Sequence, residues 1–203
     1  MLRPPREGAP APSKVGDREL EQRYQSTLAR WTRHAEIYDG LDSRAFVAAT
    51  FHSMSFREAR VARTTAFFAL PPAESQALLA VERQGHTEAL ELLLGMSANE
   101  RRFDDLARPG SMWRLALVSS AGEVLPLSID RLPRPDPNLT GLYPYLGPFW
   151  TAYRVLFPRT FANGAQVLPQ QAQTFVVRLA SSLGRVELGF ELEAPMAGAT
   201  VWP

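Results

Sequence analysis

The residues that could perform acid–base or metal chemistry are few and lie far apart along this chain. The three histidines are His34, His52 and His86, and each belongs to a different segment. A zinc site usually takes two ligands at a short spacing, such as i and i+4 on one helix. The sequence offers no such pair of histidines, and the chain has no cysteine. We therefore expect structural or surface histidines, with no metal and no other cofactor.

Asp104 and Asp105 form the one adjacent pair of carboxylates, and two carboxylates can support acid–base or glycosidic chemistry. No nucleophile elbow of the G-x-S-x-G type and no phosphate-binding glycine loop accompanies them. Catalytic geometry does not depend on chain order. A hydrolase-like enzyme that assembles His52, His86, Asp104 and Asp105 is therefore the alternative function, while turn and capping roles are the simpler interpretation of both aspartates.

A row of arginines recurs every three residues on a predicted helix, at Arg57, Arg60 and Arg63. An anionic partner such as a lipid headgroup could bind along such an edge. The spacing favours a simpler interpretation, in which the row is the solvated face of the helix.

The segment 136–150, DPNLTGLYPYLGPFW, combines proline with four aromatic side chains, Tyr143, Tyr145, Phe149 and Trp150. Proline stiffens a loop and lowers the entropy that is lost on binding, and aromatic residues are enriched at interaction hot spots. These four residues are the candidate binding surface. The alternative, which the pattern favours, is a long crossover whose aromatic side chains fill the open end of a β-sandwich.

Composition is typical of a globular protein, because 45% of the 203 residues are hydrophobic and 21% are charged. The net charge of +1 argues against a dedicated nucleic-acid partner, since such proteins carry a basic surface that replaces phosphate counterions. No apolar run approaches the length that spans a bilayer. Only Lys14 among the 22 basic residues is a lysine, which is typical of a GC-rich genome.

Residues 1–16, MLRPPREGAPAPSKVG, hold four prolines and no hydrophobic stretch of the kind that a signal peptide needs. We expect a flexible tether there. One interpretation is an ordinary terminal extension. The other is the spacer that follows the lipidated cysteine of a bacterial lipoprotein, so that a membrane would be reached only through a lipid anchor that this chain does not contain.

Three helices are predicted. Asp17 is suited to cap a helix over 17–38, whose apolar residues recur at three- and four-residue steps and which Gly40 would end. Ser53 or Ser55 would cap a second helix that ends near residue 69, before two prolines. A third helix is predicted over 72–84 and would end at Gly85.

The remaining regular segments are predicted to be strands, because apolar residues alternate with polar ones. The segment 86–96 leaves helix and strand both open, and its alternating leucines favour a strand. Residues 132–148 carry five prolines and are expected to form an irregular loop. The predicted strands cover residues 44–51, 86–96, 113–118, 125–129, 151–157, 175–179 and 186–192.

These elements predict an α+β fold in which an N-terminal helix and a helical segment pack on an antiparallel, immunoglobulin-like β-sandwich. Residues 17–195 would form one domain, with helices concentrated in 17–84 and strands in 86–193. Residues 196–203 would be a tail.

Three features together resemble uncharacterised predicted lipoproteins of myxobacteria and related GC-rich bacteria. They are the proline-rich start, a helix around Trp31, and the pattern MWRLALVSSAGEVLPLSI followed by LYPYLGPFWTAYRVLFP. The resemblance implies no activity and no functional residue. It implies a protein of the cell envelope, although the lipobox and its cysteine are missing here.

The sequence therefore favours a non-enzymatic binding or assembly module at the bacterial cell envelope, with envelope proteins as its partners. The expected location is the periplasm or the outer membrane, with the cytoplasm as the alternative. A structural subunit of an envelope machine is a third interpretation, and the oligomeric state is left open.

Overall fold

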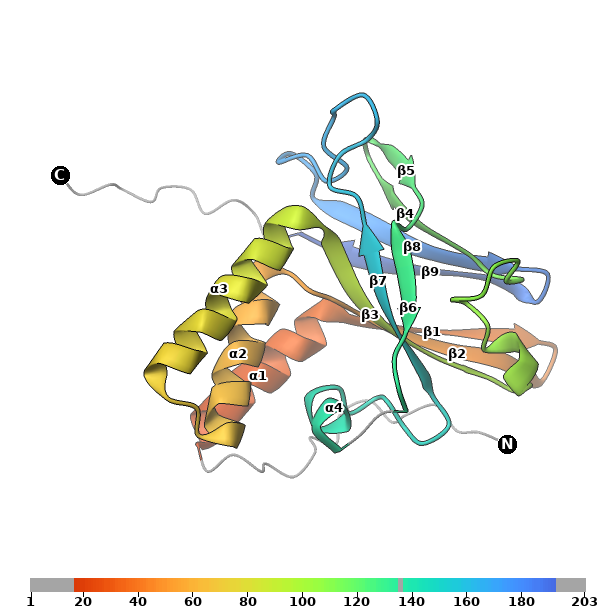
Figure 1. Cartoon of the computed structure of the whole chain (residues 1–203). Coiled ribbons are helices and arrows are strands. Elements are labelled where there is room, and N and C mark those ends of the chain that lie inside the picture. The colour runs from red at the N-terminus through yellow and green to blue at the C-terminus, as the bar shows by residue number, and fades with distance from the viewer. Residues whose placement is uncertain (1–16, 135–136, 193–203) are drawn as a thin grey trace.

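The computed structural model describes residues 17–134 and 137–192, so the predicted tether at 1–16 and tail at 196–203 lie outside the described residues. Helices and strands alternate early, and strands dominate later (Figure 1). The helices are α1 (Arg18–Trp31), α2 (Met54–Phe68), α3 (Pro72–Glu88), α4 (Pro137–Leu142) and the 3-10 helix η1 (Arg101–Phe103). The strands are β1 (Thr32–Asp39), β2 (Asp42–Phe51), β3 (Leu90–Ala98), β4 (Arg114–Ser119), β5 (Gly122–Val124), β6 (Ser128–Arg131), β7 (Thr151–Phe157), β8 (Thr174–Ser181) and β9 (Gly184–Glu191).

The strands form two antiparallel sheets, which confirms the predicted α+β class. The first sheet has five strands in the order β1-β2-β3-β7-β6, and the second has four in the order β5-β4-β8-β9. The helices α1, α2 and α3 gather at one end of the sheets, where β2 ends and β3 begins (Figure 1). The first sheet therefore combines strands from the helical and the β-rich parts of the chain.

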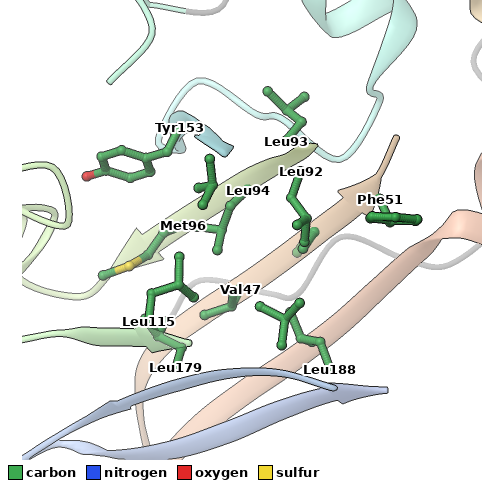
Figure 2. Packing of buried hydrophobic residues seen from close by; sticks show 14 of the residues in the cluster. Val47, Phe51, Leu92, Leu93, Leu94, Met96, Leu115, Tyr153, Leu179 and Leu188 are labelled. Carbon is green, nitrogen blue, oxygen red and sulfur yellow. The ribbon is translucent and has the colours of Figure 1, made fainter. Parts of the chain in front are cut away.

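The main core lies between the two sheets. Leu92, Leu94 and Met96 of β3 face the second sheet, whereas Leu93 points to the opposite side (Figure 2). The ring of Phe51 stands edge-on to that of Phe175, with centroids 4.9 Å apart. Alternating apolar side chains of both sheets thus interdigitate, as expected for packed antiparallel sheets.

Strand β3 is buried on both faces, because all nine of its residues are buried. One face packs on the second sheet, and the other is covered by α2 and by the chain between α4 and β7. A strand covered on both faces has a nearly continuous apolar sequence, and this accounts for the run Leu92-Leu93-Leu94. It also means that Glu91, which is only 8% exposed, must have partners inside the protein.

The predicted helix over 17–38 is correct only in its first part. Asp17 caps α1 as expected, since its Oδ1 accepts from the backbone N–H of Glu19 and of Leu20. The helix ends at Trp31, and residues 32–39 pair with β2 along the whole length of β1. Pairing with a buried neighbour decides the conformation here, because strand propensity depends on context.

Exposure near the end of β1 also departs from the predicted helical pattern. Ile37, which lay off the predicted helical stripe, is buried, and Tyr38, which lay on it, is 54% exposed. Gly40 does not end a helix, since it lies in the turn between β1 and β2 with a φ of +60°. A glycine adopts this left-handed conformation without the steric cost of a Cβ.

The other two helices agree with the prediction. Ser53 caps α2, its Oγ accepting from the N–H of Phe56 at 3.2 Å, and the helix ends before Ala69 in the left-handed conformation, with a φ of +48°. Helix α3 begins at Pro72 as predicted but continues past Gly85 to Glu88. None of the described helices is long and apolar enough to cross a membrane.

The ambiguous segment 86–96 contains the end of α3 and the strand β3, so the preference for a strand is confirmed from Leu90 onward. The predicted return strand over 125–129 is correct only at its end, because β6 begins at Ser128. The strand that returns beside β4 is β5, which ends at Val124. β5 pairs with β4 in the second sheet, whereas β6 pairs with β7 in the first. Pro126, which cannot donate a ladder hydrogen bond, lies between the two strands. The expected loop over 132–148 includes the short helix α4.

Candidate functional site

A cluster of buried polar groups lies where β3 begins beside α2. Glu91 accepts a hydrogen bond from Arg57 Nη2 at 2.7 Å and another from Arg154 Nε at 2.8 Å. His52 Nδ1 lies 3.5 Å from Glu91 Oε1, which is too long for a strong hydrogen bond. One buried carboxylate therefore holds two guanidinium groups and faces an imidazole.

A second carboxylate extends this network into α3. Arg57 Nη1 donates to Glu82 at 2.6 Å, and Arg60 Nη2 lies 2.7 Å from the other oxygen of Glu82. Arg57 Nε donates to the carbonyl oxygen of His52 at 3.1 Å. The guanidinium of Arg57 thus joins α2 to α3, to β3 and to the residue that follows β2.

Tyr143 closes the network from the far side. Its hydroxyl lies 3.0 Å from His52 Nε2 and also 3.0 Å from Arg60 Nη1. Burial, and to a lesser extent the charge of Arg60, lowers the pKa of His52 to about 4, so the imidazole is neutral at pH 7. Burial alone would raise the pKa of Glu91, but its contacts with His52, Arg57 and Arg154 hold that pKa well below its usual range.

A chain of Glu91, His52 and Tyr143 resembles an acid–base relay in its chemistry. All three side chains are buried, however, with exposed fractions of 8%, 3% and 1%. A general base must reach the proton that it abstracts from a substrate, and this network is enclosed by the protein itself. Its evident role is to hold α2, α3, β3 and the loop after α4 together.

The residues of the alternative hydrolase site are brought together only in part. The side chain of His86 contacts the backbone of His52, but Asp104 and Asp105 lie far from both histidines. His52 contacts Glu91 through its backbone at one end of β3, while Asp104 Oδ1 accepts from the N–H of Ala98 at the other end. The seven steps along β3 from Glu91 to Ala98 span about 23 Å at roughly 3.3 Å per residue. Asp105 bonds Ser111. These positions lie well beyond the reach of one catalytic centre.

The arginine row predicted as a solvated face is instead largely buried, which corrects that interpretation. Arg57 and Arg63 are 2% and 1% exposed. Arg63 donates to both oxygens of Glu21, at 2.7 and 2.9 Å, just as Arg57 and Arg60 hold acidic side chains. A spacing of three residues places side chains on one face of a helix, and here that face meets carboxylates of other elements.

Two of the four residues of the candidate binding surface are buried, which corrects the expectation for them. Tyr143 is held by His52 and Arg60, and the hydroxyl of Tyr145 lies 2.9 Å from Thr50 Oγ1. Such partners offset the desolvation of a phenolic hydroxyl and allow the ring to be buried. Tyr143 and Tyr145 are therefore anchors of the loop and do not form its outer surface.

Phe149 and Trp150 remain at the surface of the loop. Phe149 is 61% exposed, and Trp150 is partly buried, with its ring centroid 6.3 Å from that of Tyr145. The loop lies close to the sheet because Gly95 has no side chain. A Cβ at Gly95 would lie 2.9 Å from Trp150 Cε3 and 2.7 Å from Leu146 Cδ2.

A pocket of about 270 Å³ opens beside Phe149 and Trp150. It lies where the chain leaves β6 and where it enters β7, and the hydrogen bond from Leu132 N–H to the carbonyl of Ala152 joins these two segments at 2.9 Å. The pocket is lined by Asp104, Arg131, Leu132, Pro133, Arg134, Pro148, Phe149, Trp150, Thr151 and Ala152.

The side chains that line this pocket include more positive than negative charges. Asp104 is 8% exposed and is engaged with the backbone N–H of Ala98. Arg131 and Arg134 are exposed, and neither pairs with a carboxylate in the part of the chain that the structure describes. The pocket thus combines two available guanidinium groups with an exposed phenylalanine and the edge of a tryptophan.

Sequence reasoning missed several of these residues. Arg134 stood in the segment predicted as a proline-rich loop, Arg131 stood just before it, and no pattern singled them out. Glu91 gave a usable signal, because a lone acidic residue inside a strongly apolar strand must be paired when it is buried. In residues 17–134 and 137–192, no group of three or more histidine, aspartate and glutamate side chains could hold a metal ion.

No protein-family model matches this chain, and the comparison with curated proteins gives no match either. The chain is similar to one solved structure, the crystal structure of a novel protein of unknown function from Burkholderia pseudomallei K96243. The two share 13% sequence identity over 86% of this chain and 84% of the other, with a TM-score of 0.43.

Proposed function

We propose that this protein is a non-enzymatic binding module, and that its partner contacts the pocket beside Phe149 and Trp150. The observation that carries the proposal is the position of Phe149. Its side chain is 61% exposed at the rim of a pocket, on a loop that two buried tyrosines anchor to the sheet. A rigid loop with an exposed aromatic residue loses little entropy when it binds.

The rest of the fold supports a role as a platform. We also propose that the two sheets form an immunoglobulin-like sandwich, since both are antiparallel and they pack face to face (Figure 2). The pocket is bordered by the ends of β6 and β7, and Pro133 and Pro148 stiffen its two sides. Rigid elements of this kind position binding residues more accurately than free loops do.

The proposal includes the cell envelope as the location and envelope proteins as partners. The proline-rich segment before α1 and the weak resemblance to predicted lipoproteins support this part. Fatty-acid labelling and cell fractionation of the protein expressed from its native gene test it. A label and a membrane-associated signal are expected, whereas an unlabelled cytosolic protein would contradict the envelope location and leave the binding role to be tested separately.

The binding role is tested with a photo-crosslinking amino acid at position 149 in cells that produce the native gene. We expect a discrete crosslinked partner, identified by mass spectrometry. The matched control places the same crosslinker at Tyr38, which is 54% exposed on β1, at the opposite edge of the five-stranded sheet. If position 149 yields no adduct beyond those found at position 38, the assignment of this surface is wrong.

A further inference from the structure

The charges in the pocket beside Phe149 indicate what kind of group it binds. We propose that Arg131 and Arg134 hold a carboxylate attached to an apolar group, and this inference rests on the proposed binding function. Both arginines line the pocket, and neither forms an ion pair within the described residues. Guanidinium groups recognise carboxylates through paired hydrogen bonds.

The neighbouring carboxylates that the structure describes do not satisfy these two arginines. Asp130 is next to Arg131 on β6, but successive residues of a strand point to opposite faces, and Asp130 accepts from Ser128 Oγ at 3.1 Å. Asp104 shares the pocket and is held by the N–H of Ala98. Two cations and one engaged carboxylate leave an excess of positive charge that an incoming anion would balance.

The apolar part of the ligand follows from the other residues of the pocket. Phe149 and Trp150 stand beside the arginines, and Pro133 and Pro148 add apolar surface. A hydrophobic group that carries a charge would contact both kinds of residue. The volume of about 270 Å³ lies just below the range of about 300–1,000 Å³ that is common for drug-sized ligands. The pocket is therefore suited to one small organic acid or to one acidic side chain with its neighbour.

A polyanion does not fit this arrangement. Other arginines of the two sheets pair with carboxylates, as Arg154 does with Glu91 and Arg178 does with Glu123 and Glu187. The net charge of the whole chain is only +1. Nucleic acids need a continuous basic surface, whereas this pocket offers two cations at one point.

The test uses phenylacetate and phenylacetamide as probes, which share the ring and differ in charge. Binding to the full chain is followed by chemical-shift changes of backbone amides that line the pocket. We expect phenylacetate to bind at least tenfold more tightly than the amide, and added salt to weaken only the carboxylate. Arg131→Gln with Arg134→Gln should remove the difference, while the control Arg18→Gln, an exposed arginine at the start of α1, should keep it.

The outcomes separate this inference from the proposed function. Equal binding of the two probes, with loss of both in Phe149→Ala, would contradict the anionic ligand and still support a binding pocket. If neither probe shifts the pocket residues, the carboxylate inference is wrong, and crosslinking at position 149 decides the binding role independently. A third probe, the N-acetylated and C-amidated tetrapeptide Gly-Phe-Asp-Gly, distinguishes the two sources of the carboxylate. Tighter binding than phenylacetate supports a protein segment as the ligand. Weaker binding supports a free organic acid.

Discussion

The guanidinium of Arg63 donates two parallel hydrogen bonds to the carboxylate of Glu21, at 2.7 and 2.9 Å, and so joins α2 to α1. Its third nitrogen donates to the carbonyl of Gly141 at 2.6 Å, which adds α4 to the same cluster. The rings of Tyr24 and Phe67 lie 4.4 and 4.5 Å from the guanidinium carbon. This buried pair therefore anchors the segment that leads into the pocket loop.

Replacing Arg63 with methionine should destabilise the protein by about 3–5 kcal/mol, because it leaves the buried carboxylate of Glu21 without its counter-ion. Urea denaturation measures the change. The control is Arg83→Met, since Arg83 and Glu58 form an exposed pair 3.5 Å apart and such pairs contribute less than about 1 kcal/mol.

The same pair gives a second test through a double variant. Glu21→Leu together with Arg63→Met removes both charges, so the double variant should be more stable than Arg63→Met alone. A double variant at least as unstable as Arg63→Met would show that the cluster acts through the packing of Arg63 on its aromatic neighbours and not through the unpaired charge.

The close approach of the loop to β3 predicts that Gly95→Ala is harmful. The new Cβ would lie 2.7 Å from Leu146 Cδ2 and 2.9 Å from Trp150 Cε3. Overpacking of this kind costs about 1–3 kcal/mol and should displace Trp150, which its fluorescence would report. The control is Gly189→Ala in β9, where a Cβ meets nothing within 4 Å. If both variants lose the same stability, the contacts at Gly95 do not explain the loss and the packing argument is wrong.

Much of the fold could be predicted from the sequence, because local signals and tertiary structure agree. Asp17 and Ser53 cap helices with their own side chains, and the period-two pattern over β8 and β9 reflects one buried face. The prediction failed over residues 32–39, where spacings of three and four residues suggested a helix. Pairing with β2 overrides that local signal.

The candidate site could be predicted only in part. The residue types pointed to the aromatic loop. They could not show which aromatic side chains are exposed, because Tyr143 is buried in the fold and Phe149 is exposed. The difference depends on His52, Arg60 and the small residue Gly95, all of which lie far from the loop in the chain. Arg131 becomes a pocket residue only because β6 joins the first sheet and not the second.

The buried hydroxyl of Tyr153 predicts an unusual response to mutation. Its Oη makes no hydrogen bond of good geometry in the described part of the chain, although the backbone of Leu106 lies close enough to favour the charged form slightly. Burial, helped by the charge of Asp104, raises its pKa to about 12. Tyr153→Phe should therefore be neutral or should stabilise the protein by about 1 kcal/mol, since it removes an unsatisfied polar atom. Thermal unfolding measures this change.

The matched control is Tyr145→Phe. The hydroxyl of Tyr145 lies 2.9 Å from Thr50 Oγ1, so its removal should cost about 1 kcal/mol. An equal loss of stability in both variants would mean that Tyr153 has a hydrogen-bond partner in solution.

The stability of the protein should fall as the pH drops from about 6.5 to about 4. Burial lowers the pKa of His52 from 6.5 to about 4, so in this range the unfolded chain binds a proton that the folded protein rejects. Stability rises with pH wherever the unfolded state binds more protons, and a shift of this size corresponds to about 3 kcal/mol. Glu91, whose pKa is lowered, loses its stabilising contribution only at more acidic pH.

The groups that face His52 explain why the folded protein rejects the proton. Arg57 and Arg60 of α2 repel an imidazolium, and the attraction of Glu91 does not compensate for this repulsion and the burial. Denaturation at pH 7, 6, 5 and 4.5 should show a steep loss of stability that His52→Gln flattens. His86→Gln is the comparison. Burial also lowers the pKa of the half-buried His86, but its side chain touches the network only at the backbone of His52, so this variant should keep most of the slope. If His52→Gln keeps the full pH dependence, His52 is not the group that titrates.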